Sequence, residues 1–285
     1  MSYGLAMMAG MKFKRECAFG ALFLLSPLSA EMAAAGSLSY AEVDKGYLIG
    51  ASVASSSGHL GRGGVRYNLK PLWAFQVGNV RVSRSRASAL MGAGKERLET
   101  GLSTEFDLFS EWRLGASLRV DNGRTFAGDP DLVGLPDVRT TLRARGSMSR
   151  SFGPRWSWRA SVDQDLLGRE GGLRLSQGVG YRLPISEQTS LDFSFSTTWG
   201  NRRYLQTQYG ISLPAAQATG RTAYLIGSGW ESARTGVDFT HSISQHWVAF
   251  GGMAFSQLLR ASAHSPLVGR VTTSGLSLGI AYRSK

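Results

Sequence analysis

Apolar and polar residues alternate along most of the chain after about residue 46. Between Leu98 and Leu108 the even positions hold Leu, Thr, Leu, Thr, Phe and Leu, and the odd positions hold Glu, Gly, Ser, Glu and Asp. Because successive side chains of a β-strand point to opposite faces, this period of two predicts strands with one apolar and one polar face. The pattern recurs in Trp112–Val120, Val138–Met148, Trp156–Val162, Leu173–Leu183, Leu191–Trp199, Ala233–Ile243 and Leu276–Tyr282.

The lengths of the connections between these segments also alternate. With a first strand at about Gly46–Ala54 and two more within Tyr67–Leu90, the count reaches twelve strands, and every second connection is short. Short turns on one side and long loops on the other are typical of an outer-membrane barrel, with the turns in the periplasm. A β-sandwich has no reason to separate its loops in this way. The sequence therefore predicts an all-β fold, a transmembrane antiparallel up-and-down β-barrel of about 12 strands.

Charged residues fill the polar face of these predicted strands. In a membrane barrel the apolar face meets lipid and the polar face meets the lumen, where arginines and carboxylates on neighbouring strands form ion pairs. Two interpretations remain open: a lumen filled and stiffened by ion pairs, or a narrow pore that prefers anions. The predicted lumen charges are Arg113, Arg119, Arg139, Arg143, Arg145, Arg159, Asp163, Asp165, Arg174, Arg182, Asp192, Arg234 and Asp238.

Large aromatic residues fall at or near the predicted strand ends. Tryptophan and tyrosine at these positions match the aromatic girdles at the two membrane interfaces of a barrel. A packed core would instead place them toward strand centres. The residues are Trp112, Trp156, Trp158, Tyr181, Trp199, Trp247 and Tyr282.

Composition agrees with a β-protein that has many turns: 36 of the 285 residues are glycine and only 18% are charged. The net charge of +12 comes from 26 arginines and 6 lysines. These are spread along the chain instead of being clustered, which argues against nucleic acid as a partner. On the external side they indicate binding to lipopolysaccharide phosphates, and the arginines concerned are Arg62, Arg97, Arg202, Arg203, Arg221, Arg260 and Arg270.

The N-terminal segment has the pattern of a secretory signal peptide. Lys12, Lys14 and Arg15 precede an apolar run from Ala18 to Leu28, which is too short to span a bilayer, and an A-x-A site ends at Ala35. We therefore predict a signal peptide over residues 1–35, with Met11 as the true start, and a single outer-membrane barrel domain over 36–285. The only cysteine, Cys17, lies in the predicted signal, so thiol chemistry and disulfides are excluded from the mature chain.

Two loop motifs carry a family resemblance. WGNRRYLQTQYGIS followed by PAAQATGRTAY, together with HSPLV at His264–Val268, resembles the MltA-interacting protein family (MipA/OmpV). The matching residues are Trp199, Arg203, Tyr204, Gln206, Tyr209, Gly210, Ser212, Pro214, Ser265 and Pro266. We expect the longer motif to be an external loop that folds onto the barrel mouth, with Tyr204 and Tyr209 against the rim and with Arg203 and Gln206 bonded to loop backbone.

The chain departs from the family pattern at two places. Asn201 and Arg202 stand where the family usually has acidic residues, which puts a cation-binding or ion-pair role of that corner in doubt. Ser284 replaces the terminal phenylalanine, so recognition by the assembly machinery would rest on Tyr282.

No catalytic, cofactor-binding or metal-binding residues are predicted. Neither His241 nor His246 has a serine two residues further on, as a lipid-deacylating barrel needs, and His59 and His264 lie in loops without a metal-ligand spacing. The resemblance implies a non-enzymatic scaffold that joins a murein lytic transglycosylase and a murein synthase at the cell outer membrane. The alternatives are a narrow diffusion pore and a surface adhesin.

Overall fold

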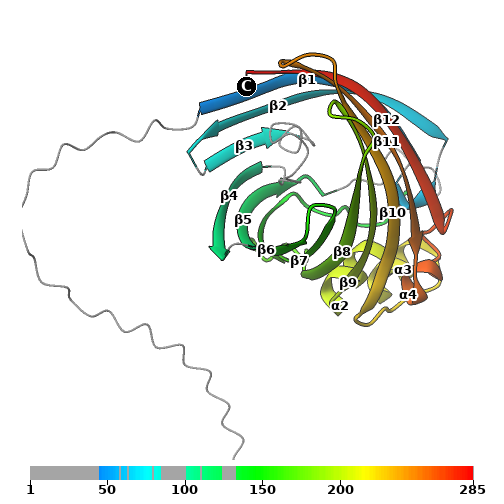
Figure 1. Ribbon diagram of the computed structural model, residues 1–285. Helices are drawn as coiled ribbons and strands as arrows, with labels where there is room; N and C mark the ends of the chain where they lie inside the picture. Colours follow the sequence, from blue (N-terminus) through cyan, green and yellow to red (C-terminus); the bar gives the residue numbers. More distant parts are fainter. Residues whose placement is uncertain are drawn as a thin grey trace, which may run out of the picture. The chain divides into compact units, whose positions relative to one another are not determined.

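The computed structural model describes residues 45–57, 59–62, 64–78, 80–84, 101–109, 111–123 and 133–284. The predicted signal peptide, Met11 and the cleavage site lie outside these residues, as does Arg97. Within the described part, twelve antiparallel strands form a closed barrel in which each strand pairs with its neighbours in sequence and β1 pairs with β12 (Figure 1). The predicted fold class is confirmed.

The strands are β1 (Lys45–Ser57), β2 (Val65–Val77), β3 (Val80–Arg84), β4 (Gly101–Phe109), β5 (Trp112–Asp121), β6 (Thr141–Phe152), β7 (Trp156–Asp165), β8 (Leu173–Pro184), β9 (Thr189–Gly200), β10 (Gly229–Ser242), β11 (Trp247–Leu258) and β12 (Thr272–Arg283). The short helices are η1 (His59–Gly61), α2 (Arg202–Tyr209), α3 (Leu213–Thr219) and α4 (Arg260–Ala263). No helix in the described part is long and apolar enough to cross a bilayer.

The predicted alternation of connection lengths is confirmed. The connections 78–79, 110–111, 153–155, 185–188 and 243–246 are short, and they lie at the same end as the start of β1 and the end of β12. The connections that carry η1, α2, α3 and α4 lie at the other end (Figure 1). By the usual orientation of such barrels, the first is the periplasmic end and the second is the external end.

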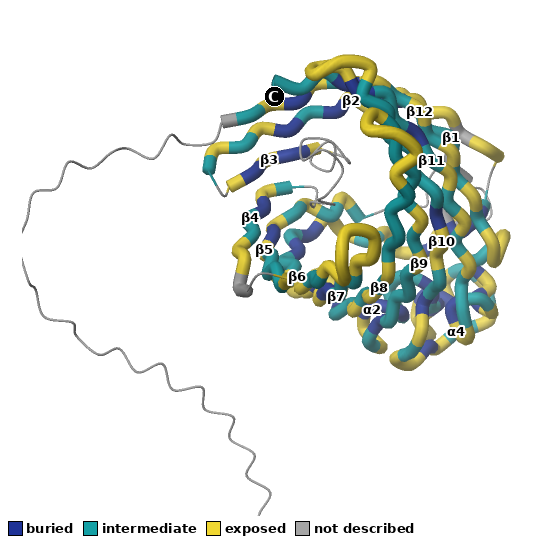
Figure 2. The backbone as a smooth tube through the Cα atoms, viewed as in Figure 1, coloured by how far each residue is buried: buried dark blue, intermediate teal, exposed yellow. Residues whose placement is uncertain are grey.

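The two faces of the barrel wall differ as the alternation predicts. Along β3 exposed and buried residues alternate (Figure 2). Val80 and Val82 are exposed on the outward face, and Arg81 and Ser83 are buried on the inward face. The outward apolar side chains remain exposed because lipid covers them in a membrane. They include Ile49, Val53, Leu69, Phe195, Phe255 and Leu278.

The seam between β1 and β12 closes the barrel, and its periplasmic end joins the start of β1 to the end of β12. The backbone N–H of Ser284 donates to the carbonyl of Tyr47 at 2.9 Å, and the Ser284 hydroxyl accepts from the Tyr47 N–H at 2.9 Å. Tyr282 stacks on Tyr47 with ring centroids 6.3 Å apart and on His246 at 5.4 Å. Ser284, which replaces the family's terminal aromatic residue, thus fastens the last strand to the first.

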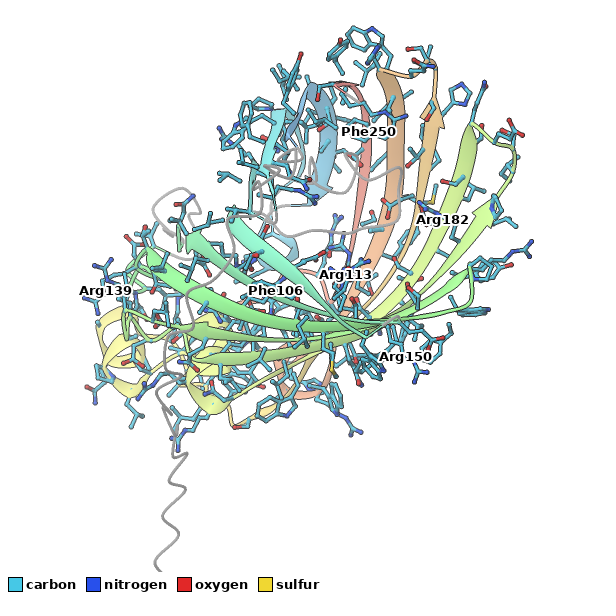
Figure 3. The ribbon with its side chains drawn as sticks, turned by 60° about the vertical axis from the view of Figure 1, so that its left-hand side comes forward. Phe106, Arg113, Arg139, Arg150, Arg182 and Phe250 are labelled. Atoms are coloured by element: carbon cyan, nitrogen blue, oxygen red, sulfur yellow. The ribbon has the colours of Figure 1, made fainter. Side chains whose placement is uncertain are left out.

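The aromatic positions are confirmed as well. At the periplasmic end, the ring centroids of Trp156 and Tyr181 lie 4.8 Å apart and those of Trp112 and Trp158 lie 6.2 Å apart. The Arg150 guanidinium lies 5.1 Å from the Trp112 ring centroid, and Figure 3 shows Arg150 at the end of β6 opposite the helices. These contacts form one interfacial girdle of the barrel.

Candidate functional site

The loop between β9 and β10 begins with a helix that the start of β8 holds in place. The Asn201 side chain caps α2 by accepting from the Tyr204 N–H at 2.9 Å, and it also accepts from the Leu173 N–H at 3.1 Å. Gly172 has a positive φ of 54°, and a Cβ there would clash with the backbone nitrogen of Tyr204. Only glycine fits this contact, so the start of β8 and the first turn of α2 are locked together.

A buried carboxylate joins this helix to β10. Glu231 accepts from the hydroxyls of both Tyr204 and Tyr209, each at 2.8 Å, and all three side chains are buried. Arg143 and Arg174 lie against the Tyr204 ring, at 5.7 and 5.9 Å from its centroid. Burial raises the pKa of the Tyr204 phenol, and the nearby Glu231 carboxylate raises it further. Tyr204 therefore stays a neutral hydrogen-bond donor at physiological pH.

The two resemblance motifs meet at the external end. The Ser265 hydroxyl donates to the Tyr209 carbonyl at 2.6 Å. Gln206 forms two bonds within its own loop, donating to the Tyr224 carbonyl at 3.3 Å and accepting from the Ile226 N–H at 2.9 Å. Side chains of the motifs therefore satisfy the backbone of the long loop, as expected for Gln206.

The remaining motif residues shape the loop ends. Gly210 ends α2 with its N–H bonded to the Gln206 carbonyl, and Ser212 caps α3, in which Pro214 occupies the first turn. Trp199 lies on the outward face of β9, and the Pro266 carbonyl accepts from Arg62 at 3.0 Å. The expectation for Arg203 is wrong: its guanidinium pairs with Glu170 at 3.4 Å, and both side chains are mostly exposed.

Apolar residues from four external loops pack into one cluster, which we call the external cap. It joins the β1–β2, β5–β6, β9–β10 and β11–β12 loops. Across the mouth, the β9–β10 loop meets the β5–β6 loop where Thr219 lies beside Gly134. The buried members of the external cap are Leu60, Leu135, Tyr204, Leu205, Tyr209, Ile211, Ala215, Ala216, Ile226 and Leu267.

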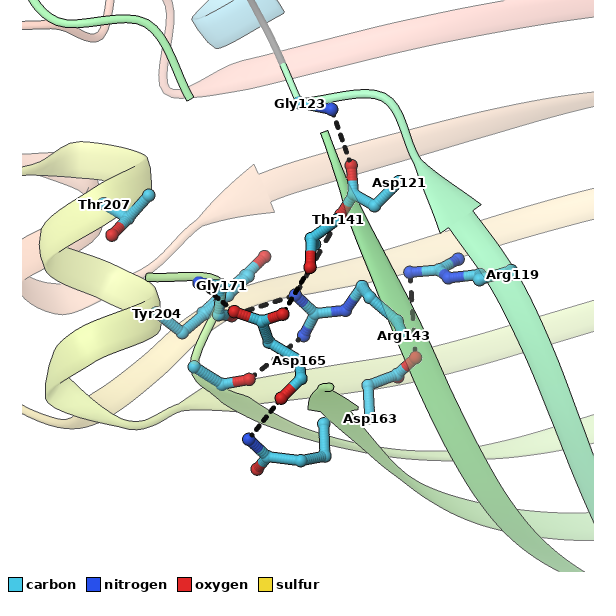
Figure 4. A network of polar contacts seen from close by, with 12 residues as sticks. Arg119, Asp121, Gly123, Thr141, Arg143, Asp163, Asp165, Gly171, Tyr204 and Thr207 are labelled. Carbon is cyan, nitrogen blue, oxygen red and sulfur yellow. Dashed lines mark hydrogen bonds and ion pairs between the residues drawn. The ribbon is translucent and has the colours of Figure 1, made fainter. Parts of the chain in front are cut away.

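Beneath the cap, inward charges of β5, β6 and β7 form an ion-pair network (Figure 4). Asp163 has no exposed surface and lies 2.8 Å from the Nε of Arg145 and 3.7 Å from the Nη2 of Arg119. Arg143 is 1% exposed, donates to the Gly171 carbonyl at 2.9 Å and lies 4.0 Å from Asp121. Desolvated charges are stable only when they are paired in this way.

Asp165 fixes the loop after β7. Its carboxylate accepts from the Thr141 hydroxyl, from the Gly171 N–H at 2.9 Å and from the Leu167 N–H at 3.1 Å. The network and the loop that carries Gly171 and Gly172 thus share one carboxylate. Through Gly172 this loop continues into the contact with α2.

Nearer the periplasmic end the lumen has a different lining. Arg182 forms a two-point ion pair with Asp192, at 3.0 and 3.1 Å. Strands β1, β2, β11 and β12 contribute a buried apolar cluster, against which Phe250 packs. Its members are Leu48, Leu72, Ala74, Val248 and Ala281. Both ends of the lumen therefore contain packed side chains.

The predicted lumen residues are inward on the strands, with one exception. Arg113, Arg159, Arg234 and Asp238 share the inward face with the residues of the network through the strand register. Arg139 does not belong to the lumen. It is exposed in the connection before β6, which begins at Thr141 and not at Val138, and Figure 3 shows it at the helix-bearing end.

Glu231 was not among the predicted residues. Its odd position in β10 would place it on the lipid face. However, a register shift between Trp230 and Ser232 inserts an extra residue, and this bulge turns the side chain toward the tyrosines.

The histidines are placed in ordinary structural contacts. His241 lies at the end of β10 and bonds through Nδ1 to the Thr189 hydroxyl at 2.9 Å, and His246 bonds to the Arg283 carbonyl at 3.1 Å. Across the described ranges no group of three or more His, Cys, Asp or Glu side chains is arranged to hold a metal ion.

The geometry can be compared with known proteins. The family model described as "MltA-interacting protein MipA" matches residues 49–284. The chain belongs to this family. The match includes both loop motifs and all the residues of the external cap, and the barrel is accordingly an outer-membrane β-barrel of the MipA family.

Solved structures give weaker likenesses to this MipA-family barrel. An anion-selective porin from Comamonas acidovorans is 11% identical, with a TM-score of 0.41, over 85% of this chain and 99% of that chain. The KdgM porin is 8% identical, with a TM-score of 0.38, over 82% of this chain and 98% of its own. The NanC porin is 8% identical, with a TM-score of 0.40, over 83% and 98%. This similarity is too low to transfer a function. The search of curated proteins gave no match.

Proposed function

We propose that this MipA-family protein is a non-enzymatic scaffold that holds a murein lytic transglycosylase and a murein synthase at the periplasmic face of the outer membrane. The observation that carries the proposal is the family match over almost the whole barrel, because the family is described by its interaction with MltA. The two loop motifs resemble the same family, and this resemblance implies that the barrel binds both the lytic transglycosylase and the murein synthase. Export through cleavage of the predicted signal peptide is part of this proposal.

The packed side chains at both ends of the lumen support a structural role over a transport role. At the external end the cap joins loops from both sides of the mouth, and beneath it Asp163 and Arg143 have almost no exposed surface. A water-filled channel would leave such charges hydrated. A barrel filled by its own side chains serves best as a rigid platform.

The surface proposed for periplasmic partners comprises the segment Gly36–Lys45, most of which lies outside the described residues, the short turns and the C-terminus. Arg155, in the turn 153–155, extends toward the Tyr181 hydroxyl at 3.4 Å, and Glu187 lies exposed in the turn 185–188. Glu111, in the turn 110–111, pairs with Arg150 at 2.8 Å. Rim charges of both signs suit a polar, reversible protein contact.

Co-purification with defined partners tests the proposal. The barrel, immobilised in detergent, is incubated with a purified lytic transglycosylase of the MltA type and with a bifunctional murein synthase. We expect both to be retained, and we expect the double variant Arg155→Glu with Glu187→Lys to weaken retention. Arg202→Glu, an exposed change at the external end, is the matched control. Failure of the unaltered barrel to retain either enzyme contradicts the scaffold.

A narrow anion-preferring pore is the second candidate. One observation favours it: the Nε of Arg119 and the Oδ2 of Asp163 are buried without a hydrogen-bond partner in the described part, and water in the lumen would satisfy them. Planar-bilayer recordings on the sample used for co-purification separate the candidates. Steady anion-selective conductance from the unaltered barrel would favour the pore.

A further inference from the structure

The outward face of the barrel carries an apolar groove that has no role in the lumen network or in the proposed scaffold. It has a volume of about 910 Å³ and crosses the wall from Phe106 on β4 to Trp199 and Trp230 on β9 and β10. Large side chains flank a floor of small residues that includes Ala116, Gly146 and Ala160. Six steps between neighbouring strands make it roughly 29 Å long.

The position of the groove selects its occupant. Most of its lining side chains share the face of the wall that carries the exposed apolar side chains of the membrane-spanning strands, so hydrocarbon surrounds the groove. The volume lies within the range of about 300–1,000 Å³ found for ligand sites. A lipid acyl chain is the extended apolar molecule available in this setting.

One polar pair interrupts the apolar lining. Gln177 and Thr197 are cross-strand partners on β8 and β9, and both line the groove. The Gln177 side chain is exposed and has no hydrogen-bond partner among the described residues. A carboxamide unsatisfied in hydrocarbon is costly. An ester, amide or hydroxyl group of an acylated lipid at this level would satisfy it.

Arginine side chains lie on the external loops next to the external end of the groove. Arg202 and Arg203 begin α2 directly after the strand that carries Trp199, and Arg139 and Arg169 are exposed on the neighbouring loops. Glu170 neutralises one of them through its contact with Arg203. This rim is suited to an anionic headgroup.

We propose that the groove binds an acyl chain of a phosphorylated glycolipid of the outer leaflet, lipid A, with a linkage group at Gln177 and Thr197 and a phosphate at the arginine rim. The lipid would lie diagonally across the strands with its headgroup outward. The site is independent of the periplasmic partners of the proposed scaffold.

The groove can be filled without disturbing the backbone. A Cβ added at Gly146 meets no atom within 4 Å, and its φ is not in the left-handed region, so Gly146→Phe projects into the groove. Ala51→Phe, on the exposed outward face of β1 and outside the groove, is the matched control. Both variants are first checked for heat-modifiable migration, which reports a closed barrel.

Native mass spectrometry of barrels reconstituted with equal amounts of lipid A and phosphatidylethanolamine measures retained lipid. We expect the unaltered barrel and Ala51→Phe to retain lipid A, and Gly146→Phe to lose it by about tenfold or more. Gln177→Leu, which adds no bulk, should weaken retention in the same direction. Arg202→Gln with Arg203→Gln should reduce the preference for lipid A over phosphatidylethanolamine. Equal retention by Gly146→Phe and Ala51→Phe, or a preference of the unaltered barrel for phosphatidylethanolamine, would overturn the proposal.

Discussion

Replacing Asp163 by Asn tests whether ion pairs hold the lumen closed. Asp163 has no exposed surface, and its partners Arg145 and Arg119 are only 17% and 28% exposed. Asparagine keeps the shape and one hydrogen-bond acceptor but removes the charge, which leaves two largely desolvated guanidinium groups with less compensation. Removing one partner of a buried pair costs about 3–5 kcal/mol. Because the arginines keep some exposure, we expect about 3 kcal/mol.

The network around Asp163 explains why no other carboxylate takes over. Asp121 lies 4.0 Å from Arg143, and Asp165 is already bonded to Thr141 and to the backbone of the next loop. Adding Asp165→Asn therefore weakens a second set of contacts and does not merely repeat the first change. The double variant should lose more stability than Asp163→Asn alone.

Thermal unfolding followed by the gel shift between closed and melted barrel measures the effect. With about 2–4 °C per kcal/mol for a chain of this size, Asp163→Asn should lower the midpoint by about 6–12 °C. Asp107→Asn is the control, because Asp107 is 79% exposed beside Arg113 and an exposed pair contributes at most about 1 kcal/mol. An unchanged midpoint for Asp163→Asn, combined with new anion-selective conductance, would refute the filled lumen.

Three further predictions follow, two on the external cap and one on export. Because folding raises the pKa of Tyr204, its contribution to loop stability is complete below about pH 10, where an unfolded tyrosine titrates, and is lost as the pH rises toward the folded pKa. Proteolysis of the 201–228 loop should therefore accelerate above about pH 10. The acceleration should be smaller in Tyr204→Phe. Glu231→Leu should leave the hydroxyls of Tyr204 and Tyr209 without their acceptor and lower the free energy of opening the same loop by about 2–4 kcal/mol at neutral pH. Protease should then cleave the loop faster, while the melting midpoint of the barrel stays unchanged. The mature protein should begin after Ala35, and intact-mass measurement that finds Cys17 would contradict this.

The strand faces were predictable because lipid imposes a strict rule on every spanning segment. Apolar side chains on one parity of a strand and charged side chains on the other, such as Leu102 and Phe106 against Glu105, leave only one orientation for the wall. The same parity placed Asp163 and Arg145 in the lumen before any contact was known. Connection lengths then gave the orientation of the barrel.

Strand ends and bulges were not predictable from the same rule. Val138 and Arg139 continue the alternation of β6 in sequence, but hydrogen bonding of the strand begins only at Thr141. At Glu231 one inserted residue reverses the parity locally. Helix α3 could have been predicted from Ser212, a capping residue, and Pro214, a proline in the first turn. The hydrogen bond between Ser265 and Tyr209 could not, because it forms only when the barrel is closed.

The external cap has a consequence for the order of assembly. Leu60 comes from the first external loop and Leu267 from the last, so their shared packing exists only once β12 has reached β1. Contacts between such distant parts of the chain form late in folding, since the intervening loop must close first. Resistance of the external loops to protease is thus a marker of a completed barrel. In an incomplete barrel the apolar motif segments would remain uncovered and accessible to the proteases of the cell envelope.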